Sequence, residues 1–219
     1  HISRTWHIPT PQGEEELSLG VAALEAFLER FPAHKLAGQA HLEIAESYLH
    51  RGRYQDAAAR LELLLTDPRY QSGEEIPAAR NRLGRSYQLQ KQYDKALAVW
   101  RDYLVKHPSD AAWREVQEQV VNTEYLKGVE RYQAKDYAAA QKVLEQFLTD
   151  HPLDSRNPAV LFLFGRINYD QEKWDEAIAD WRRVVSKYSQ SDAASHAQYM
   201  IGLTLERHLG RFADALEAY

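Results

Sequence analysis

The chain has 219 residues, no cysteine and a formal net charge of -5. The lack of cysteine excludes disulfide bridges, thiolate nucleophiles and thiolate metal sites, and the mildly acidic charge argues against a nucleic-acid-binding protein. Glycine contributes 10 residues and proline 8, a share below the average of about 12%, so few positions oppose helix formation. No apolar run approaches the roughly 18 residues of a membrane-spanning helix.

The hydrophobic pattern predicts an extended lead-in over residues 1–13, which contain Pro9, Pro11 and Gly13, and helices along the rest of the chain. The longest internal loop is expected between Asp67 and Ile76. No stretch is predicted as a strand. The predicted helices cover residues 14–31, 36–51, 54–66, 75–90, 93–106, 110–134, 137–150, 156–171, 174–187, 191–209 and 212–219.

One pattern recurs along the chain: an aromatic residue, an alanine three positions later and a proline twelve positions after the alanine. Tyr93, Ala96 and Pro108 form the clearest copy. The alanine slot, which holds glycine in a degenerate first copy, falls at positions 20, 57, 96, 140, 177 and 215. Successive slots are therefore 37, 39, 44, 37 and 38 residues apart. Each interval accommodates two helices and two short connections, so the chain is predicted to be a repeat protein.

A second marker lies upstream of the alanine slot and holds a small residue in the five copies that follow the degenerate first one. It is twelve residues upstream in four copies and thirteen in the last, where one residue is inserted. A small side chain lets two antiparallel helices approach closely, so each unit is predicted to be a tightly packed helix pair. The small residues are Ala45, Gly84, Gly128, Gly165 and Gly202.

The best copy resembles the tetratricopeptide repeat family through Gly84, Tyr87, Ala96, Trp100 and Pro108. The resemblance implies an all-α, right-handed superhelical solenoid of antiparallel helix pairs with about five and a half repeats. We expect it to form a single domain over residues 14–219 that is truncated within the last repeat. The units depart from the family in length, since the usual repeat has about 34 residues.

The joints between units are similar to those of a bacterial cell-envelope subgroup of the family. This subgroup includes the outer-membrane assembly lipoprotein and the Tol–Pal-associated periplasmic repeat proteins. The joint that contains Ser189, Ser191 and Ala194 is the best match, and Pro108 and Asp110 lie at a second similar joint. The resemblance implies a location in the periplasm or cell envelope rather than the cytoplasm.

The family resemblance also implies that the first helix of each pair lines a concave inner face. The slots expected on that face are rich in aromatic residues and arginine, which dominate interface hot spots. Such a face would suit an extended or helical peptide with acidic or proline-containing character. In an alternative interpretation, some of these tyrosines pack between repeats with their hydroxyls at the surface. The predicted partner-binding residues are Arg85, Tyr125, Tyr132, Phe162, Arg166, Tyr169 and Tyr199.

No catalytic motif is apparent among the nine histidines and the many carboxylates. The chain lacks a His-Glu-x-x-His helix, a G-x-S-x-G elbow and a phosphate-binding glycine-rich loop. His107 and His151 precede prolines and are expected at helix C-termini, where a partial positive charge suits the helix dipole. We therefore expect no enzymatic activity, no cofactor and no metal.

The sequence favours a non-catalytic scaffold, a segment of a larger polypeptide, that binds a protein or peptide on a concave face. The partner is not expected to be nucleic acid, no direct membrane span is predicted, and the oligomeric state is left open. One alternative is the helical arm of a multidomain envelope enzyme or inhibitor-like protein. A second alternative is a sensor whose groove holds a small ligand or peptide.

Overall fold

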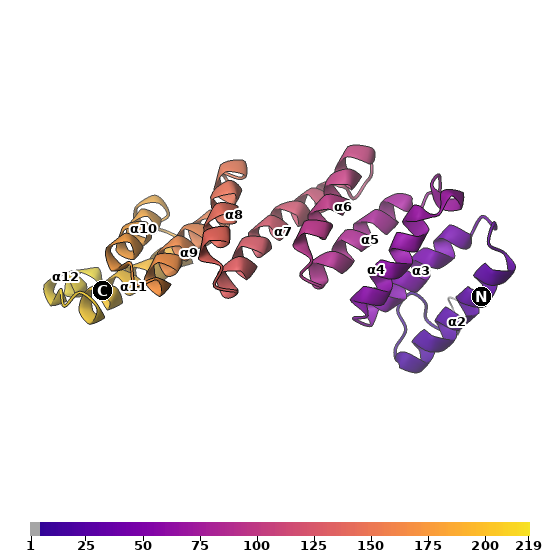
Figure 1. Cartoon of the computed structure of the whole chain (residues 1–219), viewed down its shortest axis with the longest axis horizontal. Helices are drawn as coiled ribbons and strands as arrows, with labels where there is room; N and C mark the ends of the chain where they lie inside the picture. The colour runs from indigo at the N-terminus through magenta and orange to yellow at the C-terminus, as the bar shows by residue number, and fades with distance from the viewer. Residues whose placement is uncertain (1–4) are drawn as a thin grey trace. The chain divides into compact units, whose positions relative to one another are not determined.

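The computed structural model describes residues 5–219, within which the regular structure is helical and contains no strand. Figure 1 shows successive helices lying side by side, for example α4 beside α5 and α9 beside α10. Predicted and observed helix ends differ by three residues at most, at the start of α7. A short 3-10 helix, η1 (Pro68–Tyr70), lies in the predicted long loop. The α-helices are α2 (Glu14–Arg30), α3 (Ala37–His50), α4 (Tyr54–Thr66), α5 (Ile76–Leu89), α6 (Tyr93–Lys106), α7 (Trp113–Gln133), α8 (Tyr137–Asp150), α9 (Asn157–Asp170), α10 (Trp174–Lys187), α11 (Asp192–Arg207) and α12 (Phe212–Ala218).

The chain divides into two compact units, one ending at Glu124 and the other beginning at Tyr125, so the boundary lies within α7. In the first unit, α3 packs against α4, α4 against α5, and α5 against α6. In the second unit, α9, α10, α11 and α12 pack in the same consecutive manner. The predicted all-helical fold of stacked helix pairs is confirmed, whereas the single continuous domain and its right-handed superhelical course remain predictions.

The segment before α2 differs from the extended lead-in that the sequence predicts. From Trp6 to Gly13 the backbone forms mainly turns and bends, and the side chain of Ile8 is buried. A Cβ atom added to Gly20 of α2 would lie 2.5 Å from Cδ1 of Ile8. The reason for the difference is therefore apolar packing, because Ile8 fills the space that the missing side chain of Gly20 leaves open. Residues 1–4 of the predicted lead-in lie outside the described part of the chain.

The small marker residues lie where the two helices of a pair meet, as predicted. A Cβ atom added to Gly84 would lie 2.4 Å from the indole of Trp100, and one added to Gly165 would lie 2.2 Å from Nε1 of Trp181. Both tryptophans are fully buried. The indole N–H of Trp181 donates to the carbonyl of Phe162 at 3.1 Å, which satisfies the polar atom inside the core. The close-approach role of the small residues is therefore confirmed.

At two joints between units a short polar side chain accepts a backbone hydrogen bond, and at the second of them the acceptor is the N-cap residue of the following helix. Oδ1 of Asp110 accepts a hydrogen bond from the backbone N–H of Ala112 at 2.8 Å. Ser191 Oγ accepts one from the N–H of Ala194 at 3.2 Å. Ser191 thereby satisfies one of the N–H groups that α11 leaves without an internal partner.

The two histidines expected at helix C-termini are indeed C-cap residues, His107 of α6 and His151 of α8. The predicted interaction between a positively charged histidine and the helix dipole is not supported at His107. Burial, together with the charge of Arg80, lowers the pKa of His107. The neutral form is therefore favoured there, and packing against the ring of Tyr103 at 5.3 Å is the contact observed.

Candidate functional site

In the second unit, the C-terminal halves of α7 and α9 bring three of the predicted residues together. The hydroxyl of Tyr132 on α7 donates to Oδ2 of Asp170 at 2.9 Å and accepts a bond from Nε of Arg166 at 3.4 Å. Arg166 also lies 3.8 Å from Asp170, one helical turn further along α9. Burial raises the pKa of Tyr132, which keeps the hydroxyl protonated as a donor.

The same surface continues over an aromatic group around Tyr169. The guanidinium of Arg166 lies 5.8 Å from the centre of the Tyr169 ring. The ring of Tyr169 meets Trp174 edge to face at 5.0 Å, and its hydroxyl is 2.9 Å from Nε2 of His208. His208 in turn stacks on Trp174, with ring centres 3.9 Å apart and an angle of 11° between the planes. We call these residues the tyrosine–arginine cluster: Tyr132, Arg166, Tyr169, Asp170, Trp174 and His208.

This cluster can donate hydrogen bonds and offer flat aromatic faces. The side chain of Arg166 is 35% exposed, and its contact with Asp170 is long for an ion pair. Arginine has five N–H donors, so donors remain for a ligand carboxylate or carbonyl. The aromatic rings and His208 hold one another in place, which reduces the entropy lost when they bind a partner.

The other predicted residues of the second unit lie in separate contacts. Tyr125 packs its ring 5.9 Å from that of Phe147 and lies under the guanidinium of Arg156. Burial raises the pKa of Tyr125, in keeping with a packing role. Phe162 is also half-buried, and its ring centre lies 6.0 Å from that of Trp181 and 6.3 Å from that of His196. Tyr199 is more open, being 55% exposed beside Tyr219.

Arg85 belongs to the first unit, where it is exposed on α5. Its Nη1 donates to Oε1 of Gln88 at 2.6 Å. The amide of Gln88, which is buried, donates to Oγ1 of Thr123 at 2.7 Å. Arg85 is therefore anchored by a hydrogen-bonded chain, with its remaining donors at the surface.

Three members of the cluster were not predicted from the sequence. Trp174 occupies the aromatic slot of a repeat, a position that favours core packing, yet it is only partly buried and His208 stacks on its ring. Asp170 lies four residues after Arg166, a spacing that places both side chains on one helix face and could have identified the pair. No sequence signal indicates His208, because its contact spans 39 residues.

Within residues 5–219, no group of three or more histidine or acidic side chains is placed to hold a metal ion. Over the same residues, no helix combines the length and apolar character needed to cross a bilayer.

Family comparisons match the chain in three segments. Residues 15–74 and 82–110 match tetratricopeptide repeat models. These two segments are therefore similar to tetratricopeptide repeats. Residues 117–216 match the family described as an outer membrane lipoprotein, YfiO. Tetratricopeptide repeats typically form scaffolds for protein interaction, so the class of function predicted from the sequence is supported at this level. A search of curated proteins finds no match.

Three solved structures are similar to this chain at low sequence identity. MamA AMB-1 is 18% identical, with a TM-score of 0.46 over 84% of this chain and 89% of that one. MamA from Desulfovibrio magneticus RS-1 is 18% identical, with a TM-score of 0.46 over 83% and 90%. A tetratricopeptide repeat protein from Parabacteroides merdae is 14% identical, with a TM-score of 0.44 over 94% and 72%. Likenesses this weak carry no conclusion about function.

Proposed function

We propose that the chain is a non-catalytic scaffold that binds a peptide segment of a partner protein at the tyrosine–arginine cluster. The observation that carries the proposal is the convergence of Tyr132, Arg166 and Tyr169 on one surface. Tyrosine and arginine combine a large contact area with hydrogen-bond donors, and they are enriched among residues that dominate binding energy. The similarity of two segments of the same chain to tetratricopeptide repeats supports this class of function.

The chemistry of the cluster favours an extended segment that carries an acidic side chain and an apolar or proline residue. The open donors of Arg166 would pair with a carboxylate, and charge-assisted bonds of this kind are stronger than neutral ones. The ring of Tyr169 would pack against the apolar residue. The match of residues 117–216 to an outer membrane lipoprotein family supports a partner in the bacterial cell envelope.

Selection from a display library of short random peptides tests this proposal without knowledge of the partner. We expect the selected sequences to be enriched in acidic and proline residues. Affinity of a selected peptide should fall at least about tenfold for the double variant Arg166→Ala, Tyr169→Ala, because both hot-spot side chains are lost. The matched control is Arg183→Ala on α10, which removes an arginine that is 63% exposed and lies outside the cluster.

Equal affinity of the cluster variant and the parent chain, with helical circular dichroism unchanged, would contradict the assignment of the site. Failure to select any peptide from the library, with the parent chain folded, would contradict peptide binding itself. Loss of affinity in the Arg183→Ala control as well would show that binding follows net charge and is not located at the cluster.

A further inference from the structure

The loop between α4 and α5 folds back onto the joint between α2 and α3. We call residues 67–75 the strap. The hydroxyl of Tyr70 donates to the carbonyl of Pro32 at 2.8 Å. The carboxyl group of Glu75 lies against Gly38, so close that a Cβ atom there would be 1.5 Å from Oε1. Between strap and joint lies a cleft of about 630 Å³ whose walls include Lys35 and Arg69.

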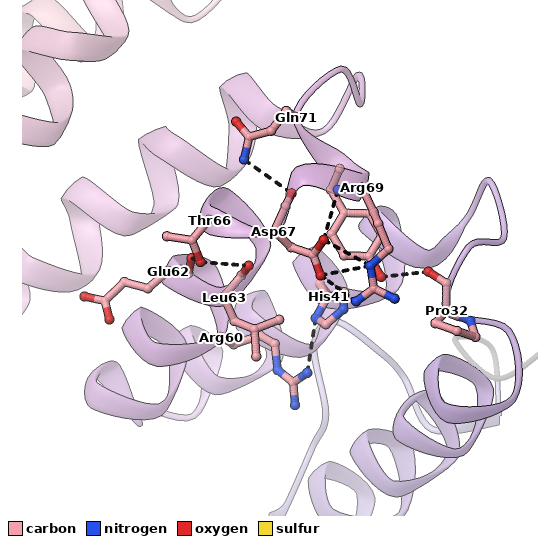
Figure 2. A network of polar contacts seen from close by, with 10 residues as sticks. Pro32, His41, Arg60, Glu62, Leu63, Thr66, Asp67, Arg69 and Gln71 are labelled. Atoms are coloured by element: carbon pink, nitrogen blue, oxygen red, sulfur yellow. Dashed lines mark hydrogen bonds and ion pairs between the residues drawn. The ribbon is translucent and has the colours of Figure 1, made fainter.

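His41 of α3 lies beneath the strap and is 5% exposed. Its ring is 5.2 Å from that of Tyr70, and its Nδ1 is 3.1 Å from Nη1 of Arg60 on α4. Figure 2 shows this contact, with the strap residues Asp67 and Arg69 on the other side of the imidazole. Since arginine can only donate, Nδ1 of His41 must accept, and the imidazole is therefore neutral in this arrangement.

The charged groups around His41 come from every neighbouring element. Arg60 forms an ion pair with Glu25 of α2, so its guanidinium is fixed in place. On the strap, the carboxylate of Asp67 accepts hydrogen bonds from Arg69, and the positive charge of Arg69 offsets much of the negative charge of Asp67. A proton on Nδ1 would point directly at the Arg60 guanidinium and abolish the hydrogen bond. The negative charge that would compensate a protonated His41 is that of Asp67, which lies on the strap.

We propose that the strap is a pH-released element, held closed by neutral His41 and opened when His41 becomes protonated. Protonation replaces a hydrogen bond with repulsion between two cations, and the imidazolium is buried beneath Tyr70. The repulsion between the two cations is relieved if His41 separates from Arg60 or if water enters beneath the strap. The second route breaks the contact of Tyr70 with Pro32 and uncovers the cleft.

The direction of the pH effect follows from burial. Burial is the largest influence on His41 and lowers its pKa, against an opposing effect of Asp67 and with a smaller effect of Arg69 in the same direction. The open state, in which His41 meets water, therefore binds the proton more tightly than the closed state. Stability of the closed strap is present near neutral pH and is lost as the pH falls below about 6.5.

The absence of cysteine makes a direct distance measurement possible. Spin labels on the double variant Ala33→Cys, Ser72→Cys would report the separation between joint and strap, two exposed positions that line the cleft. We expect one short distance at about pH 7.5 and a second, longer population at about pH 5. In the additional variant His41→Gln, which keeps an acceptor for Arg60 but cannot be protonated, the short distance should persist at both pH values.

Two further variants keep the test decisive. His34→Gln removes the exposed histidine of the same cleft and should leave the response to pH unchanged. Tyr70→Phe removes only the hydroxyl that holds Pro32 and should increase the longer population at both pH values. If the parent distance does not change with pH, or if His41→Gln still opens on acidification, the proposal is wrong. Should His41→Gln fail to fold, an unchanged response in Tyr70→Phe relative to the parent would equally overturn it.

Discussion

At the scale of single residues, the turns within helix pairs share one backbone feature. A residue with positive φ stands five positions before the alanine slot in five successive copies: Gly52, Lys91, Lys135, Glu172 and Gly210. Glycine adopts this left-handed conformation without steric cost, whereas a side chain brings Cβ close to the following carbonyl. Three repeats therefore carry local strain that the surrounding helix pair must overcome.

We predict that Lys135→Gly stabilises the chain. The substitution relieves the left-handed strain at φ 61° but adds freedom to the unfolded chain. The net gain in the free energy of unfolding should be about 0.5–1 kcal/mol, as measured by urea denaturation. Ala138→Gly, three residues further along at an exposed position of α8, is the matched control. It should lose about 0.5–1 kcal/mol, and a loss in both variants would refute the strain at Lys135.

At the scale of helix pairs, a large residue of the second helix covers a small residue of the first. Trp100 lies over Gly84, Leu144 over Gly128 and Trp181 over Gly165, each sixteen residues after its glycine. In the last pair Tyr219 meets Gly202 after seventeen residues, which reflects the one-residue insertion seen in the sequence. The sizes of the two residues therefore depend on each other, because the large side chain has space only while its partner is a glycine without a side chain.

A double-mutant cycle on Gly165 and Trp181 tests this constraint. Gly165→Ala should cost about 1–3 kcal/mol through overpacking, and Trp181→Leu about 2–5 kcal/mol through a cavity. The double variant should be more stable than the sum of the two predicts, because the smaller side chain makes room for the added methyl group. Thermal or urea denaturation measures all four proteins. Strict additivity would show that the two residues do not share the same space.

At the scale of the whole molecule, the main helix contacts link elements that are close in chain order within each unit. Proteins of this kind have stabilities that depend on individual repeats and on the interfaces between neighbours. The two compact units should accordingly respond separately to a local defect.

Hydrogen exchange can detect this separation. In Gly165→Leu, amide protection should fall in α9 and α10, since the leucine side chain cannot fit beside Trp181. Protection in α3 and α4 of the first unit should stay within about twofold of the parent, because no neighbour-to-neighbour interface there is altered. An equal loss of protection in both units would instead indicate one cooperative structure.

The fold was largely predictable from the sequence because its information is local and repeated. Helix bounds follow from the 3.6-residue period and from caps such as Ser191, and the in-phase small residues specify which helices pair. The lead-in was less predictable. Its shape depends on the burial of Ile8 against Gly20, a contact between segments whose patterns are individually weak.

The candidate site was predictable only in part. Arg166 and Tyr169 were found because they occupy fixed slots of the repeat, and their aromatic or cationic nature suffices to indicate a surface. The sequence did not show which of these slots contribute side chains to the same cluster. Tyr125 was placed in the same group, yet its ring packs on Phe147, while Trp174 and His208 join the cluster through a stacking contact over 34 residues.

The sequence by itself therefore determined the helix pairs, their order and their close packing, since periodicity and residue size act over one or two turns of chain. Only the tertiary structure decided which polar and aromatic groups meet, as at Tyr132 and Asp170, or which histidine is buried against an arginine, as His41 is. Such contacts depend on the rotation and stacking of neighbouring pairs. These are fixed by many small packing energies rather than by any single motif.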